Sequence, residues 1–268
     1  MAKLRAPEGC PWDRKQTHAS LKPYLLEETY EVLETIDHED RDKLREELGD
    51  VLLQVIFHAQ IAEESGSFTI TDVLNTLAEK LIRRHPHVFN TEPADDTTLT
   101  PEQVYGRWEA IKKQERAAKG EPHSALDGVP KTLPALLRAY QLQARAARVG
   151  FDWPDSRDGV KQVLDKVEEE CRELRQALDH RPQPDPEVVA AEIGDMLFSI
   201  VNLARKLKVN PEDSLRMAAE RFGTRFHYIE SEARDAGTSV EQLDLVEMDR
   251  LWEEAKRALA ADPRPPGS

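Results

Sequence analysis

The sequence predicts an all-α fold built from a duplicated helical unit. Apolar residues recur at intervals of three and four along much of the chain, which is the spacing of one face of an α-helix. Charged residues make up 33% of the chain and aromatic residues only 6%, and no segment shows a convincing strand pattern. Short motifs also occur twice in the same order, which indicates a duplicated unit.

The first half is expected to contain four helices. We place them at 19–38, 41–64, 71–84 and about 101–118. The segment 51–57 is apolar nearly all round, which is typical of a helix in the middle of a bundle. His85-Pro86 ends the third helix, because the residue before a proline disfavours the helical conformation.

The second half is expected to repeat this arrangement after a linker. Glycines and prolines gather between 120 and 134, where helices are disfavoured. We place the later helices at about 133–148, 158–179, 187–207, 211–235 and 240–260. The predicted domains are 1–119 and 149–260, with 120–148 as linker and connecting helix and 261–268 as a disordered tail.

The duplicated motifs place charged and aromatic residues at matching positions. The pairs are Glu27–Glu31 with Glu169–Glu173, Glu47–Asp50 with Glu192–Asp195, Lys80 and Arg84 with Arg221 and Arg225, and Trp108 and Lys112 with Trp252 and Lys256. Each correspondence is weak alone, but their shared order and similar separations indicate a repeat.

Carboxylates three residues apart share one face of each acidic helix. In the first half these are Glu28 with Glu31 and Glu47 with Asp50. Four carboxylates facing one another repel unless a cation lies between them, and magnesium suits an all-oxygen site. The alternative is a solvated acidic face, which is common for a single Glu-rich helix. Asp50 and Asp195 favour the metal, because each directly precedes an apolar run.

The basic and aromatic pairs have two interpretations. A basic pair near a helix end often only complements the helix dipole, and a Trp on a helix more often belongs to the core. Beside a metal cluster, the same basic pair would hold phosphate oxygens, and a Trp with a Lys one turn away would stack a base and neutralise a phosphate.

Composition excludes several classes of function. A net charge of −14 argues against nucleic acid or an anionic membrane as a partner. The two cysteines are far apart and are expected to be reduced thiols in a cytoplasmic protein. The chain has no phosphate-binding P-loop motif and no Glu-x-x-His motif of a di-iron bundle.

Together these motifs resemble the all-α nucleoside triphosphate pyrophosphohydrolases, and most closely the tandem-domain MazG proteins. Supporting segments include Gly-Cys-Pro-Trp-Asp at 9–13, Leu-Glu-Glu-Thr-Tyr-Glu-Val at 26–32 and Arg-Arg-His-Pro-His-Val-Phe at 83–89. The resemblance implies two tandem helical-bundle units with four-helix cores. It also implies a homodimer that uses Mg²⁺, with Mn²⁺ as the alternative. It further implies cleavage of a nucleoside triphosphate between the α and β phosphates.

Residue roles are carried over from the resemblance. It implies metal ligands at Glu170, Glu173, Glu192 and Asp195, and at their first-half equivalents Glu28, Glu31, Glu47 and Asp50. It implies substrate contacts at Arg221, Arg225, Trp252, Lys256, Lys80, Arg84, Trp108 and Lys112. Glu169 or Glu173 would orient or deprotonate the attacking water. Tandem relatives are thought to work mainly through the second copy.

Two alternatives remain open from the sequence. The chain could be a non-catalytic helical regulator that binds nucleotides or a protein, with structural acidic motifs. It could also hydrolyse a narrower substrate, because base preference depends on the shape of a pocket that the sequence does not show.

Overall fold

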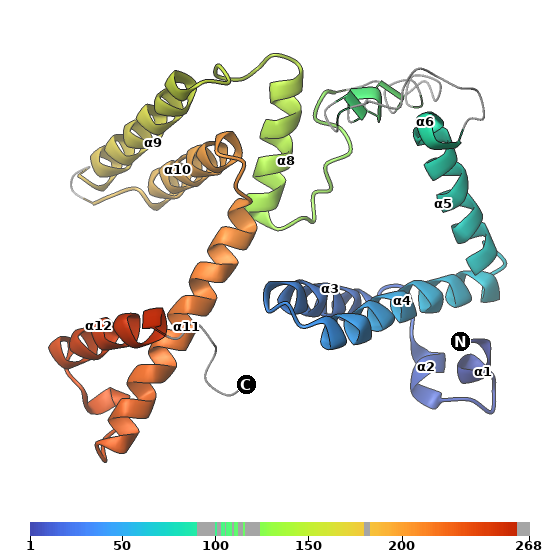
Figure 1. The fold of residues 1–268 in the computed structure, drawn as a ribbon, viewed down its shortest axis with the longest axis horizontal. Helices are drawn as coiled ribbons and strands as arrows, with labels where there is room; N and C mark the ends of the chain where they lie inside the picture. The colour runs from blue at the N-terminus through green and yellow to red at the C-terminus, as the bar shows by residue number, and fades with distance from the viewer. Residues whose placement is uncertain are drawn as a thin grey trace. The chain divides into compact units, whose positions relative to one another are not determined.

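The computed structural model is all-α throughout the residues that it describes, which are 1–89, 100, 103–104, 106–108, 110–111, 115, 124–179 and 183–261 (Figure 1). These residues contain no strand, which confirms the predicted fold class. The chain divides into two compact units, Met1–Glu121 and Pro122–Ser268, and each is described by itself. The predicted helix at 101–118 and the predicted tail at 261–268 lie largely outside the described residues.

The first unit is built around one long helical hairpin. Its helices are α1 (Ala2–Arg5), α2 (Pro11–Lys15), α3 (Lys22–Asp37), α4 (Arg41–Glu64), α5 (Ile70–Arg84) and α6 (Pro86–Phe89). Helix α3 packs along α4, and α5 follows from the end of α4. Asp40 caps α4 by accepting a hydrogen bond from the Lys43 amide at 3.0 Å. This cap fixes the start of α4 at the predicted residue 41.

The second unit has α10 at its centre. Its helices are α8 (Ala135–Arg148), α9 (Arg157–Leu178), α10 (Pro186–Lys206), α11 (Pro211–Asp235), the 3₁₀ turn η1 (Val240–Gln242) and α12 (Leu245–Ala261). Both α9 and α8 pack against α10, whereas α12 packs against α11. Asp185 and Asn210 cap α10 and α11, and a proline follows each cap at the first helical position.

Two details differ from the predicted elements. The helix expected to connect the halves, α8, packs against α10 and α11 inside the second unit. The single helix expected at 240–260 is divided, because Asp244 starts a new helix by accepting a hydrogen bond from the Glu247 amide at 2.8 Å. The proposed boundaries at 119, 148 and 260 stay predictions.

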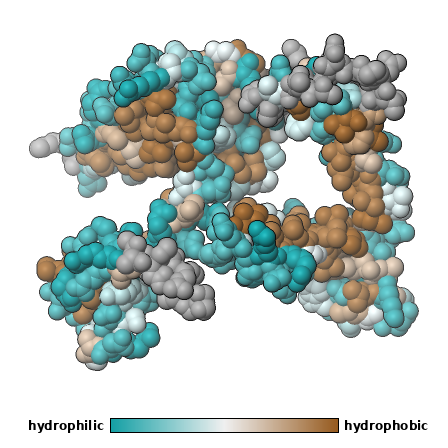
Figure 2. All heavy atoms as spheres, in the orientation of Figure 1, coloured by the Kyte–Doolittle hydropathy of each residue, from teal (hydrophilic) through white to brown (hydrophobic). Residues whose placement is uncertain are grey.

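Apolar side chains remain exposed on the two acidic hairpins, which are the helix pairs α3–α4 and α9–α10. On α4, Leu52 is 55% exposed and Leu53 41%, so the prediction of a helix enclosed on all sides is wrong for these residues in the structure. Ile193 and Leu197 on α10 are similarly open, and Figure 2 shows hydrophobic side chains gathered over the α9–α10 pair. None of the described helices is long and apolar enough to span a membrane. The described residues of the chain leave these apolar faces open to solvent.

Candidate active site

Three carboxylates converge in the second unit where α9 packs on α10. Glu170 comes from α9, and Glu192 and Asp195 come from α10. Each offers one oxygen atom, and these atoms lie within 4.8 Å of one another. Burial raises the pKa of Glu192, and the nearby charges of Glu173, Asp195 and Glu170 raise it further. The oxygen Oε2 of Glu192 is buried and has no hydrogen-bond partner among the described residues.

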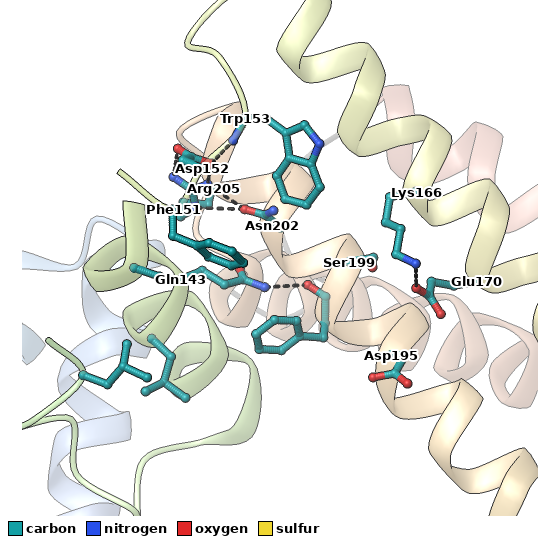
Figure 3. Close-up of a pocket in the computed structure, with 14 residues that line it drawn as sticks. Gln143, Phe151, Asp152, Trp153, Lys166, Glu170, Asp195, Ser199, Asn202 and Arg205 are labelled. Atoms are coloured by element: carbon teal, nitrogen blue, oxygen red, sulfur yellow. Dashed lines mark hydrogen bonds and ion pairs between the residues drawn. The ribbon is translucent and has the colours of Figure 1, made fainter. Parts of the chain in front are cut away.

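Lys166 is the residue of this cluster that the sequence motifs did not indicate. Its ammonium nitrogen lies 2.7 Å from Glu170 (Figure 3) and 3.0 Å from Glu169. The hydrogen bonds to these two carboxylates raise the pKa of Lys166, so it is a cation at neutral pH. The available signal was its position one helical turn before Glu170, which places both residues on one face.

The first unit brings together the matching carboxylates. Glu28 on α3 converges with Glu47 and Asp50 on α4, again with oxygen atoms within 4.8 Å of one another. Glu31 lies close enough to Glu28 and Glu47 to raise the pKa values of both. Burial and the neighbouring carboxylates raise the pKa values of Glu28 and Glu47. Three of the four predicted carboxylates therefore converge in each unit, and Glu31 and Glu173 are not among them.

The donor atoms fit a hard divalent cation. Two oxygen ligands of one Mg²⁺ lie about 3 to 4 Å apart, so the clustered oxygens need only small side-chain adjustments. Both clusters offer carboxylates alone, without His or Cys, which suits Mg²⁺ or Mn²⁺ better than softer metals. The unpartnered oxygen of Glu192 is a buried acceptor that a cation would satisfy.

The predicted substrate-binding residues of the second unit form a separate group on α11 and α12. The Arg225 guanidinium lies over the Trp252 ring, 5.4 Å from its centre. Phe222 contacts the same ring, with centroids 5.3 Å apart. Lys256 pairs with Glu253 at 2.8 Å. Arg221 lies one turn before Arg225 on α11, so this group is on other helices than the carboxylates.

The corresponding residues of the first unit differ in their partners. Arg84 pairs with Glu115 at 2.7 Å, and Arg83 pairs with the same carboxylate. Hydrogen bonds from the two guanidinium groups lower the pKa of Glu115 to about 2. Trp108 packs edge-on against His85, with centroids 4.8 Å apart. Lys80 lies on α5 one turn before Arg84, and Lys112 lies outside the described residues.

A cavity of about 470 Å³ adjoins the carboxylates of the second unit. Lys166, Glu170 and Asp195 line one side of it, and Phe151 and Trp153 line the other (Figure 3). The sequence motifs gave neither aromatic residue a role in binding substrate.

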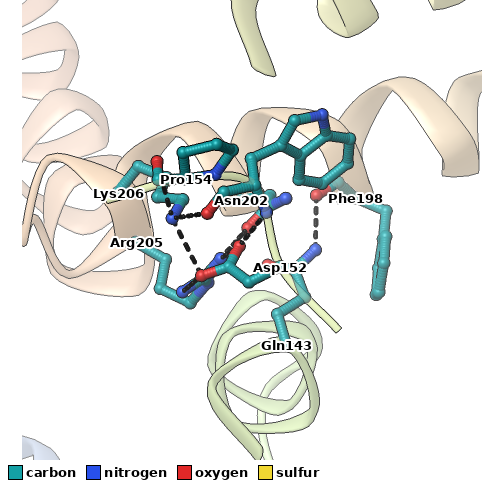
Figure 4. A network of polar contacts seen from close by, with 8 residues as sticks. Gln143, Asp152, Pro154, Phe198, Asn202, Arg205 and Lys206 are labelled. Atoms are coloured by element: carbon teal, nitrogen blue, oxygen red, sulfur yellow. Dashed lines mark hydrogen bonds and ion pairs between the residues drawn. The ribbon is translucent and has the colours of Figure 1, made fainter. Parts of the chain in front are cut away.

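An ion-pair network anchors the loop that carries these aromatic residues. Asp152 accepts two hydrogen bonds from Arg205, at 2.5 and 3.1 Å, and one from Lys206 at 2.8 Å (Figure 4). Burial would raise the pKa of Asp152, but the hydrogen bonds and charges of Arg205 and Lys206 outweigh it and hold the pKa below its usual value. The network ties the loop before α9 to the end of α10.

Comparison with known proteins agrees with this geometry. Residues 16–89 match the family model of the MazG nucleotide pyrophosphohydrolase domain. The chain is 50% identical over 256 residues to the nucleoside triphosphate pyrophosphohydrolase/pyrophosphatase MazG of Thermotoga maritima, covering 96% of this chain and 92% of that protein. It is 46% identical over 258 residues to a nucleoside triphosphate pyrophosphohydrolase of Escherichia coli, covering 96% and 94%. Because these relatives are 50% and 46% identical to it and aligned over nearly their whole length, this chain belongs to the MazG family of nucleoside triphosphate pyrophosphohydrolases.

Proposed function

We propose that the chain hydrolyses nucleoside triphosphates to nucleoside monophosphates and pyrophosphate, with Mg²⁺ as cofactor and Mn²⁺ as the alternative. The observation that carries the proposal is the convergence of Glu170, Glu192 and Asp195 beside a cavity large enough for a nucleoside. The names of the two full-length relatives support the same activity.

Charge explains why a cation is needed. A triphosphate brings about four negative charges to carboxylates that already repel one another. When bound, Mg²⁺ would neutralise part of this charge and lower the pKa of a bound water. Glu170, Glu192 and Asp195 would hold it with Glu173, and the first-unit equivalents are Glu28, Glu31, Glu47 and Asp50.

Glu173, as a carboxylate that would not be fully used as a metal ligand, is the better candidate for the general base. It lies close enough to Glu192 to raise the pKa of that residue. Glu169, the other candidate, is already paired with Lys166 at 3.0 Å. A water molecule transfers a proton to Glu173 and attacks the α phosphorus. The bond from this phosphorus to the oxygen that bridges the α and β phosphates breaks, and pyrophosphate leaves with the electron pair.

We also propose that the working protein is a homodimer. Ile193 and Leu197 expose apolar surface on α10, and a Cβ added at Gly194 would meet no atom within 4 Å. A second copy would bury this face, because exposed apolar stripes of paired helices associate readily. In a dimer, Arg221 and Arg225 of one copy would reach the triphosphate held by the other.

Light scattering and complementation test the dimer. We expect twice the chain mass in solution. Mixing inactive Glu192→Gln with the weakened Arg225→Ala should raise kcat/KM well above that of Arg225→Ala alone, because mixed dimers would contain one intact site. A monomeric mass, or no such rise after verified subunit exchange, would contradict the arrangement.

Pyrophosphate release tests the function itself. We expect release from nucleoside triphosphates in Mg²⁺, none in EDTA, and none from a folded Glu173→Gln variant. Circular dichroism of the variant checks that its helices remain. A metal-bound protein that binds nucleotide but never releases pyrophosphate would instead support the non-catalytic regulator.

A further inference from the structure

We propose that the cavity beside the second carboxylate cluster holds the nucleobase of the substrate, and that Gln143 and Asn202 contact the edge of the base. This inference rests on the proposed function, because the carboxylate side of the cavity would then receive the triphosphate. The opposite side is apolar and aromatic, and it is formed by elements of the second unit alone. Polarity therefore changes across the cavity as it does along a nucleotide.

The aromatic wall suits a flat ring. Trp153 and Phe151 come from the loop before α9 (Figure 3). Phe198 comes from α10 (Figure 4). Phe151 is 82% exposed and Trp153 36%, so both retain surface that a ligand can cover. Asp152 lies between them and is fixed to Arg205 and Lys206. The loop is thereby held in place for stacking, which contributes to binding without distinguishing strongly among bases.

Gln143 supplies a hydrogen-bond acceptor. Its side chain is 8% exposed, and its Nε2 donates to the Phe198 carbonyl oxygen at 2.8 Å. A carbonyl can only accept, so this contact fixes the orientation of the amide. The other amide atom, Oε1, is buried without a partner among the described residues. An unpartnered buried acceptor is costly and indicates a missing donor.

Asn202 supplies a donor. It is 7% exposed, and its Oδ1 accepts from Arg205 Nε at 2.9 Å and from Nη2 at 2.7 Å. Arginine can only donate, so the Asn202 amide nitrogen must be turned away from it. Figure 3 shows this nitrogen on the side of Asn202 away from Arg205. No described residue forms a hydrogen bond with it.

A neighbouring acceptor and donor match the edge of a nucleobase. Each of the four common bases presents at least one N–H group together with an oxygen or ring-nitrogen acceptor. The pair would therefore accept all four and discriminate against a base without an N–H group. Unsubstituted purine is such a base, because it retains ring-nitrogen acceptors and a flat ring but has no exocyclic amine.

The experiment compares adenosine triphosphate, the triphosphate of unsubstituted purine riboside, and inorganic triphosphate. Wild-type protein should hydrolyse adenosine triphosphate with a kcat/KM about 10-fold above that of the purine analogue, since the analogue leaves Gln143 Oε1 unpaired. In Gln143→Leu the two substrates should have nearly equal kcat/KM values. Asn202→Asp keeps the acceptor for Arg205 and removes the donor, and it should lower the ratio of adenosine triphosphate to inorganic triphosphate about 10-fold.

Gln54→Leu is the matched control. Gln54 is a buried amide of the first unit, 6% exposed, with an unpartnered Oε1. Its replacement should leave both substrate ratios at the wild-type value. An unchanged adenosine-to-purine ratio in Gln143→Leu would overturn the assignment. Absence of hydrolysis of any triphosphate by wild-type protein would instead contradict the proposed function.

Tryptophan fluorescence tests binding separately from turnover. Adenosine monophosphate added in EDTA should quench the emission of wild-type protein, and Trp153→Phe should remove most of that quench. Trp252→Phe should retain it. The opposite result would place the base at Trp252 and overturn the proposal.

Discussion

The two units hold the same carboxylates but differ in what lies beside them. In the second unit Lys166 pairs with Glu170 at 2.7 Å. The corresponding position of the first unit is Tyr24, which packs edge-on against Trp12 with centroids 5.7 Å apart. One cluster therefore contains a paired cation, and the other has an aromatic contact in its place.

The basic residues show a second difference. Arg84 of the first unit is paired with Glu115, which also binds Arg83. Arg225 of the second unit lies over Trp252, and the structure records no ion pair for it among the described residues. A phosphate must displace a carboxylate to reach Arg84 but not to reach Arg225. The comparison favours the second unit as the main site of hydrolysis, as the resemblance also implies.

Matched substitutions of the metal ligands should give the largest difference between the units. Asp195→Asn removes a ligand from the second cluster, and we expect kcat to fall on the order of 1,000-fold, because a metal contributes several kcal/mol to transition-state stabilisation. Asp50→Asn makes the same change in the first cluster and should cost less than about 3-fold. Steady-state pyrophosphate release measures both. Equal losses would show that both units contribute.

The segments before the two acidic hairpins are anchored by ion pairs of opposite polarity. In the first unit Arg5 near the N-terminus binds Glu64 at the end of α4, at 2.7 Å. In the second unit the loop supplies Asp152, and the end of α10 supplies Arg205 and Lys206. The Asp152 side chain is 19% exposed, whereas that of Glu64 is 40% exposed and therefore better screened by water.

Asp152→Asn should destabilise the second unit by about 3 kcal/mol, because it leaves two largely buried cations without their carboxylate. Glu64→Gln should cost less than about 1 kcal/mol. Since the pKa of Asp152 is lowered in the folded protein, its stabilising contribution is complete above the ordinary carboxyl pKa and is lost as pH falls through the lowered value.

Denaturant unfolding across a pH series checks this prediction. The difference between wild type and Asp152→Asn should be constant from about pH 5 to 7 and should shrink below about pH 4. A difference that persists unchanged in acid would mean that the charge of Asp152 is not the cause.

Substitution of the arginines should have an intermediate effect. Arg225→Ala removes a charged phosphate contact, and we expect kcat/KM to fall about 30-fold, mainly through KM. Arg84→Ala should change kcat/KM by less than about 2-fold, because Glu115 already neutralises this arginine. A comparable loss in both variants would contradict the view that Glu115 makes Arg84 less available.

Helix positions were predictable because periodicity and caps are local. The boundaries 41–64 and 211–235 agree with α4 and α11, where Asp40 and Asn210 provide the caps. The break at Asp244 was missed because the apolar spacing continues on both sides of it. The exposure of Leu52 was missed for a different reason, since periodicity identifies an apolar face but not the surface that covers it.

The candidate site was predictable only where it repeats. The paired carboxylates occur twice in order, so their grouping followed from the sequence. Gln143 and Asn202 belong to no motif, and their free amide atoms are defined only by the contacts of the folded chain. Asp152 meets Arg205 across 53 residues, a pairing that composition and spacing do not indicate.

The smallest predicted effect concerns Lys166 and metal removal. In EDTA, Lys166→Met leaves the nearly buried Glu170 without its cation and should lower the stability of the second unit by about 1 kcal/mol. Saturating Mg²⁺ should raise the melting temperature of both proteins and reduce the difference between them, because the metal supplies positive charge to the same carboxylate. Calorimetry with and without Mg²⁺ measures these shifts in melting temperature.

Lys161→Met is the control. It breaks an exposed pair with Asp158 on the same helix and should change stability in neither condition. The prediction treats Lys166 as a substitute for the charge of the metal. Equal destabilisation of Lys166→Met in EDTA and in saturating Mg²⁺ would contradict it.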